Sequence, residues 1–410
     1  MEFRVSKCSL VFSVFIISMF MPSFFLNSIF NMIENFAFLA SSFILFKYKY
    51  KWNNVTIAIT VYWLEIMLMT FINGLSTVDY HFVISNSKII ICILFIDFML
   101  QTHRKSAINI LFYILLIYIV ADFVSVLLFP DGLYFVAREW NQWSTTYSAQ
   151  WILGNKNNRV IWYLMFLAIS YCKFDLLKKK KSIYPAIFSV CSVVVVILVQ
   201  SSTATVALLI AGFGLIFSYY KRSKTKININ HKVIFLTYSV LSIVILLGNL
   251  FANQIGALNS LSEYLFGKDI STVLARTLAW EGTIAQIIQA PLTGHGIISS
   301  SNAGNILGSI AFTDAHNAIL NILWQGGFIA LGMVIIVFWQ ISKQAKYVNN
   351  RNTSFFISTL LIAILVETLF ESVLSQNYGW YMMIILYDIT LIYSDKTIFV
   401  RAKNQQEDLA

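Results

Sequence analysis

Long apolar stretches recur along this 410-residue chain, and they decide what it can fold into. Stretches of about 17–25 apolar residues cross roughly 30 Å of hydrocarbon when they form an α-helix. These stretches are continuously apolar rather than alternating, which favours helices over the strands of a membrane barrel. The sequence therefore predicts an all-α, polytopic integral membrane protein, with a single membrane domain over 1–410. Twelve spans are predicted, at 9–29, 31–47, 54–73, 83–100, 107–129, 159–176, 183–201, 203–220, 233–251, 318–341, 354–372 and 378–394.

The charged residues also fit a membrane protein. The chain is 58% hydrophobic and 12% charged, and its net charge of +10 comes from short basic clusters between apolar segments. Such clusters are typical of cytoplasmic loops, so we expect both termini in the cytoplasm and no nucleic-acid partner. Because no cleavage site follows the first apolar run, we expect a retained first helix. The basic residues outside the predicted inner segments are Lys88, Arg138, Lys156, Arg159, Lys268 and Arg276.

Acidic residues inside the predicted spans are costly unless they are paired. Some of them are therefore expected to line the interior of the bundle, with Lys88 as a candidate partner. These residues are Glu34, Glu65, Asp97, Asp122, Glu367 and Glu371.

Two connections on the predicted outer side, 130–158 and 252–315, are long enough to carry a site. Loops above about 15 residues are usually functional or disordered, and the aromatic and apolar residues here argue against disorder. Arginine suits a phosphate because its planar fork makes two charge-assisted hydrogen bonds. Aromatic rings suit sugars, although Trp140 and Trp143 fit an interfacial belt equally well. The first loop offers Arg138, Trp140, Trp143, Tyr147, Lys156 and Asn157, and Arg159 follows at the mouth of the sixth predicted span.

The second outer loop leads into a histidine at the mouth of a membrane helix. An amphipathic helix is predicted at 273–289, with Arg276 near its start, and a glycine-rich run follows at 291–302. His316 then stands where a polar loop enters an apolar segment, a place suited to proton transfer beside lipid-borne substrates. Structural interpretations stay open for three residues. Asp314 fits a helix cap, His295 a turn residue between two glycines, and Arg276 an interfacial anchor.

The order of these residues resembles the O-antigen polymerase and O-antigen ligase superfamily (Wzy/WaaL type). That family has an arginine, a tryptophan one turn later, a Pro-Leu-x-Gly-x-Gly turn, and a His-Asn pair opening a helix with a downstream glycine. The matching residues are Arg276, Trp280, Pro291-Leu292-Thr293-Gly294-His295-Gly296, His316-Asn317, Gly326 and Gly327. Residues 154–158 resemble the family's Gly-x-x-x-Asn turn, and 200–204 stand where it often has a Ser-Arg step. The similarity covers about 150–340.

One departure concerns the second arginine of the family's pattern. Thr203 occupies that place and cannot neutralise a phosphate. Arg159, Arg138 or Lys156 would then have to supply the second positive charge, or the donor is held differently.

The resemblance implies a GT-C-like bundle and a glycosyltransferase that acts outside the bacterial cytoplasmic membrane, without a metal or another cofactor. It would transfer a glycan from a polyprenyl diphosphate, such as undecaprenyl diphosphate, to a sugar hydroxyl. His316 would be the general base, with Asp314 or Asn317 orienting its ring, and Arg276 would stabilise the diphosphate. The other residues expected to bind donor or acceptor are Arg159, Arg138, Lys156, Asn157, His295, Asn317, Asp314 and Trp280.

We favour a polymerase of O-antigen, capsule or exopolysaccharide repeat units, with a lipid-linked acceptor. A chain-length regulator and a flippase are further expected partners, beside the lipid bilayer. The alternative is an O-antigen ligase that transfers the glycan to a lipid A core or other acceptor. A flippase of lipid-linked oligosaccharide or another transporter is less favoured, because transporters show repeated halves and short outer loops.

Overall fold

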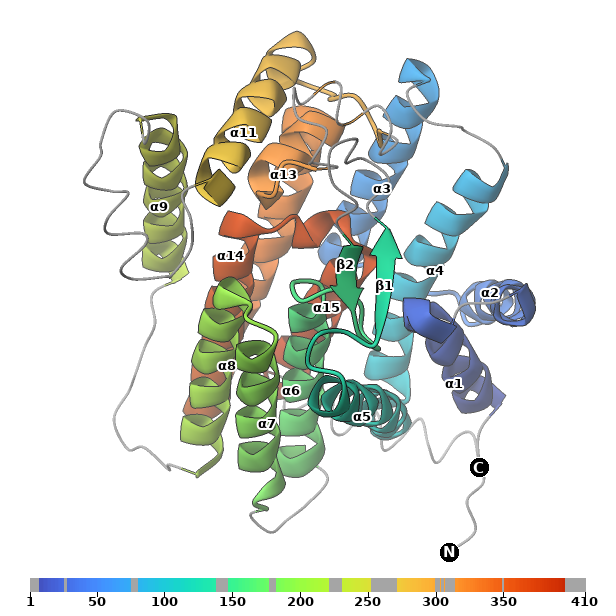
Figure 1. The fold of residues 1–410 in the computed structure, drawn as a ribbon. Helices are drawn as coiled ribbons and strands as arrows, with labels where there is room; N and C mark the ends of the chain where they lie inside the picture. The colour runs from blue at the N-terminus through green and yellow to red at the C-terminus, as the bar shows by residue number, and fades with distance from the viewer. Residues whose placement is uncertain are drawn as a thin grey trace, which may run out of the picture.

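The computed structural model describes residues 7–25, 28–74, 80–137, 147–176, 182–220, 231–251, 271–298, 303, 306, 314–348 and 350–394. Each of the twelve predicted spans corresponds to a different α-helix, and the described part of the chain is mostly helical (Figure 1). The helices are α1 (Lys7–Met19), α2 (Ser28–Lys47), α3 (Asn54–Asn73), α4 (Tyr80–Thr102), α5 (Arg104–Leu128), α6 (Arg159–Leu176), α7 (Tyr184–Leu198), α8 (Ser202–Tyr220), α9 (His231–Phe251), α11 (Ser271–Gln289), α13 (Ala318–Ala345), α14 (Arg351–Phe370) and α15 (Asn377–Ser394).

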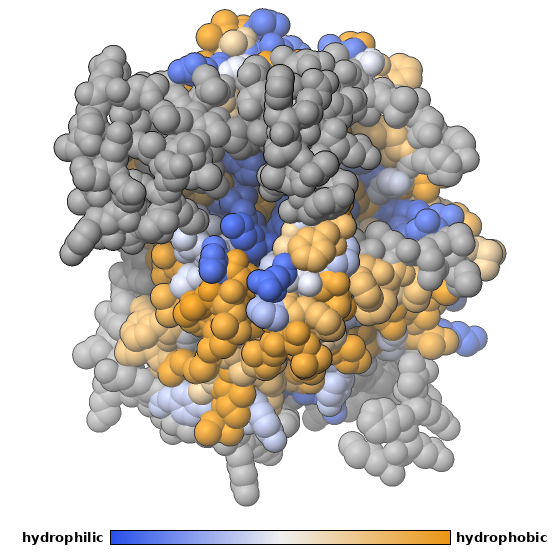
Figure 2. Space-filling view, in the orientation of Figure 1, coloured by the Kyte–Doolittle hydropathy of each residue, from blue (hydrophilic) through white to orange (hydrophobic). Residues whose placement is uncertain are grey.

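Within the described part of the chain, 6 helices are long and apolar enough to cross a membrane, namely α3, α4, α5, α8, α13 and α14. Shorter apolar helices occur at Lys7–Met19, Tyr184–Leu198 and Lys232–Val244. A multi-pass, helical membrane protein is therefore confirmed, while the number of twelve spans stays a prediction. The surface agrees with this conclusion, because Figure 2 shows a broad apolar band across the molecule and hydrophilic residues gathered above it.

Two local expectations about the fold need correction. The first predicted span, 9–29, is too long, because α1 ends at Met19 and a short 3-10 helix follows at Ser23–Phe25. Pro22 explains this, since the residue before a proline is disfavoured in helical conformation. The first outer loop also contains an unpredicted hairpin, in which β1 (Tyr134–Ala137) pairs antiparallel with β2 (Tyr147–Gln150). The amphipathic helix predicted at 273–289 is confirmed as α11.

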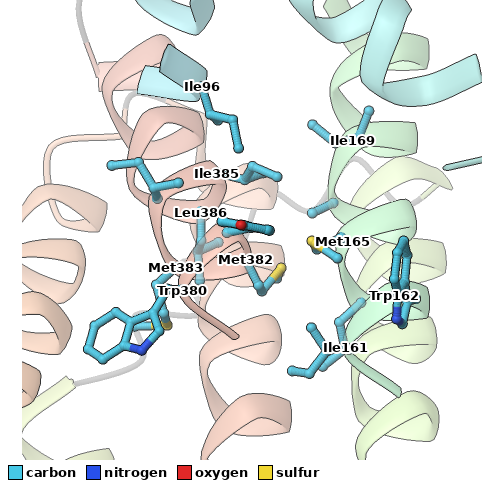
Figure 3. Packing of buried hydrophobic residues seen from close by; sticks show 14 of the residues in the cluster. Ile96, Ile161, Trp162, Met165, Ile169, Trp380, Met382, Met383, Ile385 and Leu386 are labelled. Atoms are coloured by element: carbon cyan, nitrogen blue, oxygen red, sulfur yellow. The ribbon is translucent and has the colours of Figure 1, made fainter. Parts of the chain in front are cut away.

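Helices α6 and α15 form the centre of the bundle, and both are buried on all sides over most of their length. Figure 3 shows their packing, with Ile161 and Met165 of α6 lying on the side of that helix that faces Met382 of α15. A helix that is apolar all round belongs in the interior of a membrane bundle. This dense centre fixes the first turns of α6 and α15, which both begin at the end of the bundle that carries the candidate site.

If successive spans cross the membrane in alternating directions, the start of α6, the turn before α8, the end of α14 and the start of α15 lie on the same side. In the structure these four segments come together. The start of α6 contacts both the turn before α8 and the segment after α14, through Ser201–Asn157 and Asn157–Glu371 hydrogen bonds of 3.0 and 2.7 Å. The start of α15 joins them, because Gln376 donates to Asn158 at 2.9 Å. Among the acids within the spans, Glu34 pairs with Lys88 at 3.0 Å, as expected.

Candidate active site

His316 lies in a strained loop that leads directly into α13. Its φ of +46° is in the left-handed region, which non-glycine residues adopt rarely and often at functional sites. Two neighbours stabilise this conformation. Asp314 Oδ1 accepts the backbone N–H of His316 at 2.7 Å, and Asn317 caps α13 by accepting the N–H of Leu320 at 3.1 Å. Asn317 also donates to the carbonyl of Leu369 at 3.0 Å, which ties the loop to the end of α14.

The carboxylate nearest to the imidazole belongs to Glu371, the residue that ends α14. Its Oε2 lies 3.5 Å from His316 Nδ1, whereas Asp314 Oδ1 lies at 3.8 Å and also accepts the Ser372 hydroxyl at 3.1 Å. Glu371 is 8% exposed, while the His316 side chain is 28% exposed. The pair therefore has a largely desolvated acid behind a ring that solvent or substrate can reach. From the sequence, Glu371 was only one of several acids within the spans, so its place beside His316 was missed.

Asn157 links Glu371 to the rest of the site. Its side-chain amide donates to Glu371 Oε1 at 2.7 Å, and its carbonyl oxygen accepts the Ser201 hydroxyl at 3.0 Å. The turn before α6 positions Asn157, because Asn155 Oδ1 accepts its backbone N–H at 3.0 Å. Ser201 follows Gln200, which has a positive φ of +55°. Two motifs that are separate in the sequence are thus joined in one hydrogen-bonded chain, which runs from Ser201 through Asn157 to Glu371 and ends 3.5 Å from His316 Nδ1.

Arg159 does not fit the expected role of binding the donor directly. It is fully buried, and its guanidinium pairs with Asp122 at 3.2 Å while stacking over the Trp151 ring at 4.7 Å. Tyr163 also donates to Asp122, at 3.0 Å. A buried charge needs such partners, so this arginine holds the hairpin region and α5 against α6. Lys156, three residues earlier, is exposed and stays a candidate for contact with substrate.

Helix α11 is fastened to the loop that carries His316. Trp280 is buried, and its indole N–H donates to the carbonyl of Ala315 at 2.8 Å. Its ring packs with Ala315 and Leu320, so Trp280 positions the loop. Arg276 lies on α11 one turn before Trp280, and residues four apart share a helix face. The side chains of 271–278, that of Arg276 included, lie outside the described part of the structure.

The Pro-Leu-x-Gly-x-Gly turn packs against a break in α13. At Gly327 the helix leaves the α conformation with a φ of +58°, and Phe328 N–H bonds to the Pro291 carbonyl at 2.8 Å. The backbones approach so closely that a Cβ on Gly294 would lie 2.5 Å from the Gln325 carbonyl carbon. His295 Nε2 lies 3.0 Å from the Gln286 carbonyl, which joins the turn to α11. His295 therefore has a structural role in this turn.

The remaining expected residues fall in the first outer loop. Arg138, Trp140 and Trp143 lie outside the described residues, and Tyr147 begins β2. Among the residues that the structure describes, no three His, Cys, Asp or Glu side chains form a metal-binding group.

Residues 187–335 match a family model described as O-antigen ligase. This stretch of the chain is similar to O-antigen ligases. None of the curated proteins matches the chain significantly. Proteins of this family are glycosyltransferase-like enzymes of polysaccharide assembly, which act on lipid-linked oligosaccharides in a membrane. The resemblance to the O-antigen ligase and polymerase superfamily is thereby confirmed.

The site draws on more of the chain than the segment that matches the family model. Ser201, Trp280 and His316 lie inside the matched residues 187–335. Asn157 precedes that segment and Glu371 follows it, yet the two are hydrogen-bonded to each other and Glu371 lies 3.5 Å from the imidazole. The matched segment thus supplies the histidine, and the turn before α6 and the residue after α14 supply the polar groups behind it.

Proposed function

We propose that the protein polymerises polysaccharide repeat units by transferring a glycan from a polyprenyl diphosphate to a sugar hydroxyl of a lipid-linked acceptor. The observation that carries the proposal is the pair of His316 and Glu371, whose closest atoms are 3.5 Å apart. A ring backed by a buried carboxylate and open on its other side is suited to accept a proton from a hydroxyl.

In the proposed reaction, His316 accepts the proton of the acceptor hydroxyl as its oxygen attacks the anomeric carbon of the donor. The bond between that carbon and the phosphate oxygen breaks, and the polyprenyl diphosphate leaves with the bonding electrons. Glu371 faces Nδ1, so Nε2 is the nitrogen left for the acceptor. The carboxylate would stabilise the imidazolium that forms, and Asn157 would hold the carboxylate in place.

The leaving diphosphate needs positive charge, which we assign to Arg276 and Lys156. Arg276 shares a face of α11 with Trp280, whose indole reaches the residue next to His316. Lys156 is exposed and adjoins Asn157, which contacts Glu371. Since Arg159 is committed to Asp122, Lys156 is the candidate for the charge that the family's second arginine would supply.

We place the site on the extracytoplasmic side of the membrane. The helix α13 begins beside His316 and runs 28 residues, and the basic residues Lys343, Lys346 and Arg351 lie near its far end. Basic residues favour the cytoplasmic side, which supports an outer location for the histidine. Termini in the cytoplasm and a location in the bacterial inner membrane are part of the same proposal.

The experiment is a polysaccharide ladder from cells that carry His316→Ala or Arg276→Ala. Both variants are expected to lose long polysaccharide while single lipid-linked repeat units remain. His103→Ala is the control, because this histidine lies between α4 and α5 and should leave the ladder intact. Normal ladders from His316→Ala would refute the proposal. If purified protein extended a core-lipid acceptor and not a lipid-linked repeat unit, the ligase alternative would replace the polymerase.

A further inference from the structure

An apolar groove separates α9 from α14. It is lined by Val233, Thr237 and Leu241 on α9, and by Ile362, Val366 and Leu369 on α14. Residues at these spacings share one face of each helix, so two parallel walls enclose the space. The groove has a volume of about 340 Å³, at the lower end of the range for ligand pockets. It is large enough for part of a lipid chain.

The groove lies at the outer edge of the bundle. Val233 is 55% exposed and Leu241 is 45% exposed, so the α9 wall is open to the surroundings. Figure 1 shows α9 at the periphery, apart from the central helices. A hydrogen bond of 2.9 Å between Tyr238 and Thr368 joins the two walls. Because the lining is mostly apolar, the groove suits a hydrocarbon chain.

One end of the groove reaches the candidate active site. Leu369, which lines the groove, accepts the hydrogen bond from Asn317 beside His316. Glu371 follows two residues later, immediately after the end of α14. A molecule with its polar head at His316 would therefore find this groove directly below the site.

We propose that the groove binds the isoprene units next to the diphosphate of the polyprenyl donor. This inference rests on the proposed function, since that function makes the donor an amphiphile whose head lies near His316. The bilayer is as apolar as the groove, so burial in the groove gains little hydrophobic free energy. The role of the groove is to orient the first isoprene units, so that the anomeric carbon faces the acceptor.

Photocrosslinking tests the inference without turnover. A photoreactive amino acid replaces Val366, and a control protein carries it at Val206, an α8 valine that is 48% exposed and lies outside the groove. Each full-length protein is reconstituted in phosphatidylglycerol nanodiscs that contain a small mole fraction of undecaprenyl diphosphate. Adducts at position 366 should be enriched in the polyprenyl lipid about tenfold over position 206, an apparent preference of ~1.4 kcal/mol. Equal enrichment would overturn the inference and indicate a groove filled by phospholipid.

A kinetic variant adds a second measurement. Val366→Trp should fill the groove and lower kcat/KM for the lipid-linked donor about tenfold, because the first isoprene units are no longer oriented, whereas Val206→Trp should leave kcat/KM unchanged. An unchanged kcat/KM in a folded Val366→Trp protein would count against the groove.

The two proposals can fail separately. If adducts at position 366 are selective for the polyprenyl lipid but His316→Ala protein is active, the proposed catalysis is rejected while lipid binding in the groove is supported. Inactive His316→Ala protein without selective adducts would reject only the groove.

Discussion

Replacing Glu371 by glutamine should slow glycan transfer and leave the fold intact. Glutamine keeps the shape of the side chain and can still accept the hydrogen bond from Asn157, but it removes the negative charge 3.5 Å from His316 Nδ1. At that distance two unit charges interact by about 5 kcal/mol for an effective dielectric constant of 20. The His316 side chain is 28% exposed, so solvent screens part of this energy.

The proton is also only partly transferred in the transition state, so we expect a loss of about 2–3 kcal/mol, or roughly 30- to 150-fold in kcat. KM for the donor should change little, because Glu371 sits behind the imidazole rather than on the substrate side. The assay is polymerisation of purified lipid-linked repeat units by protein in proteoliposomes. Thermal unfolding of the same preparation reports on the fold.

Two variants make this measurement specific. Glu371→Asp keeps the charge and should recover part of kcat. Asp175→Asn removes a carboxylate that accepts from Tyr393 near the end of α6, far from its first turn and the site, and should leave kcat unchanged. A wild-type kcat in Glu371→Gln would refute the role of the charge. If Glu371→Gln lost kcat and also unfolded at a clearly lower temperature, the loss would be explained by a structural role of Glu371.

Two further predictions separate structural from substrate-binding residues. Arg159→Met should destabilise the protein by about 3–5 kcal/mol, because it leaves Asp122 buried without its charge partner, whereas Lys156→Met should keep the melting temperature and raise the KM for the donor. Equal melting temperatures for these two variants would contradict the structural role of Arg159. Trp280→Phe should lower stability by about 1–2 kcal/mol, since the Ala315 carbonyl loses its donor, and should also lower kcat by loosening the loop at His316. Thermal unfolding and the polymerisation assay measure both effects, and an unchanged kcat would show that the indole does not position the loop.

The helices of this fold were predictable because membrane spans are encoded locally. Continuous apolar runs place each helix within a few residues, and the error in α1 came from Pro22, a single local signal given too little weight. The hairpin of β1 and β2 was missed because its short strands lie inside a polar loop without a strong alternating pattern. Its Trp151–Phe129 hydrogen bond of 2.7 Å is a tertiary contact that the sequence does not mark.

The candidate site was predictable only in part. His316 and Trp280 stand in a recognisable order along the chain, and the structure brings Trp280 to the residue before His316. Arg159 was misread because a lone arginine at a helix start looks the same whether it meets a phosphate or a buried acid such as Asp122. The distinction depends on burial, which the sequence around Arg159 does not reveal.

Glu371 shows why the rest of the site needed the structure. An acid at the end of a membrane span has several explanations, including an ion pair such as Glu34–Lys88. One signal was available, because alternating topology puts the end of the eleventh predicted span on the same side as the start of the tenth. Topology gives the side but not the neighbour, and only the packing of α6 and α14 beside α13 brings Asn157 and Glu371 to the ring. A histidine motif therefore locates the chemistry, while helices outside the matched domain set how the ring is held.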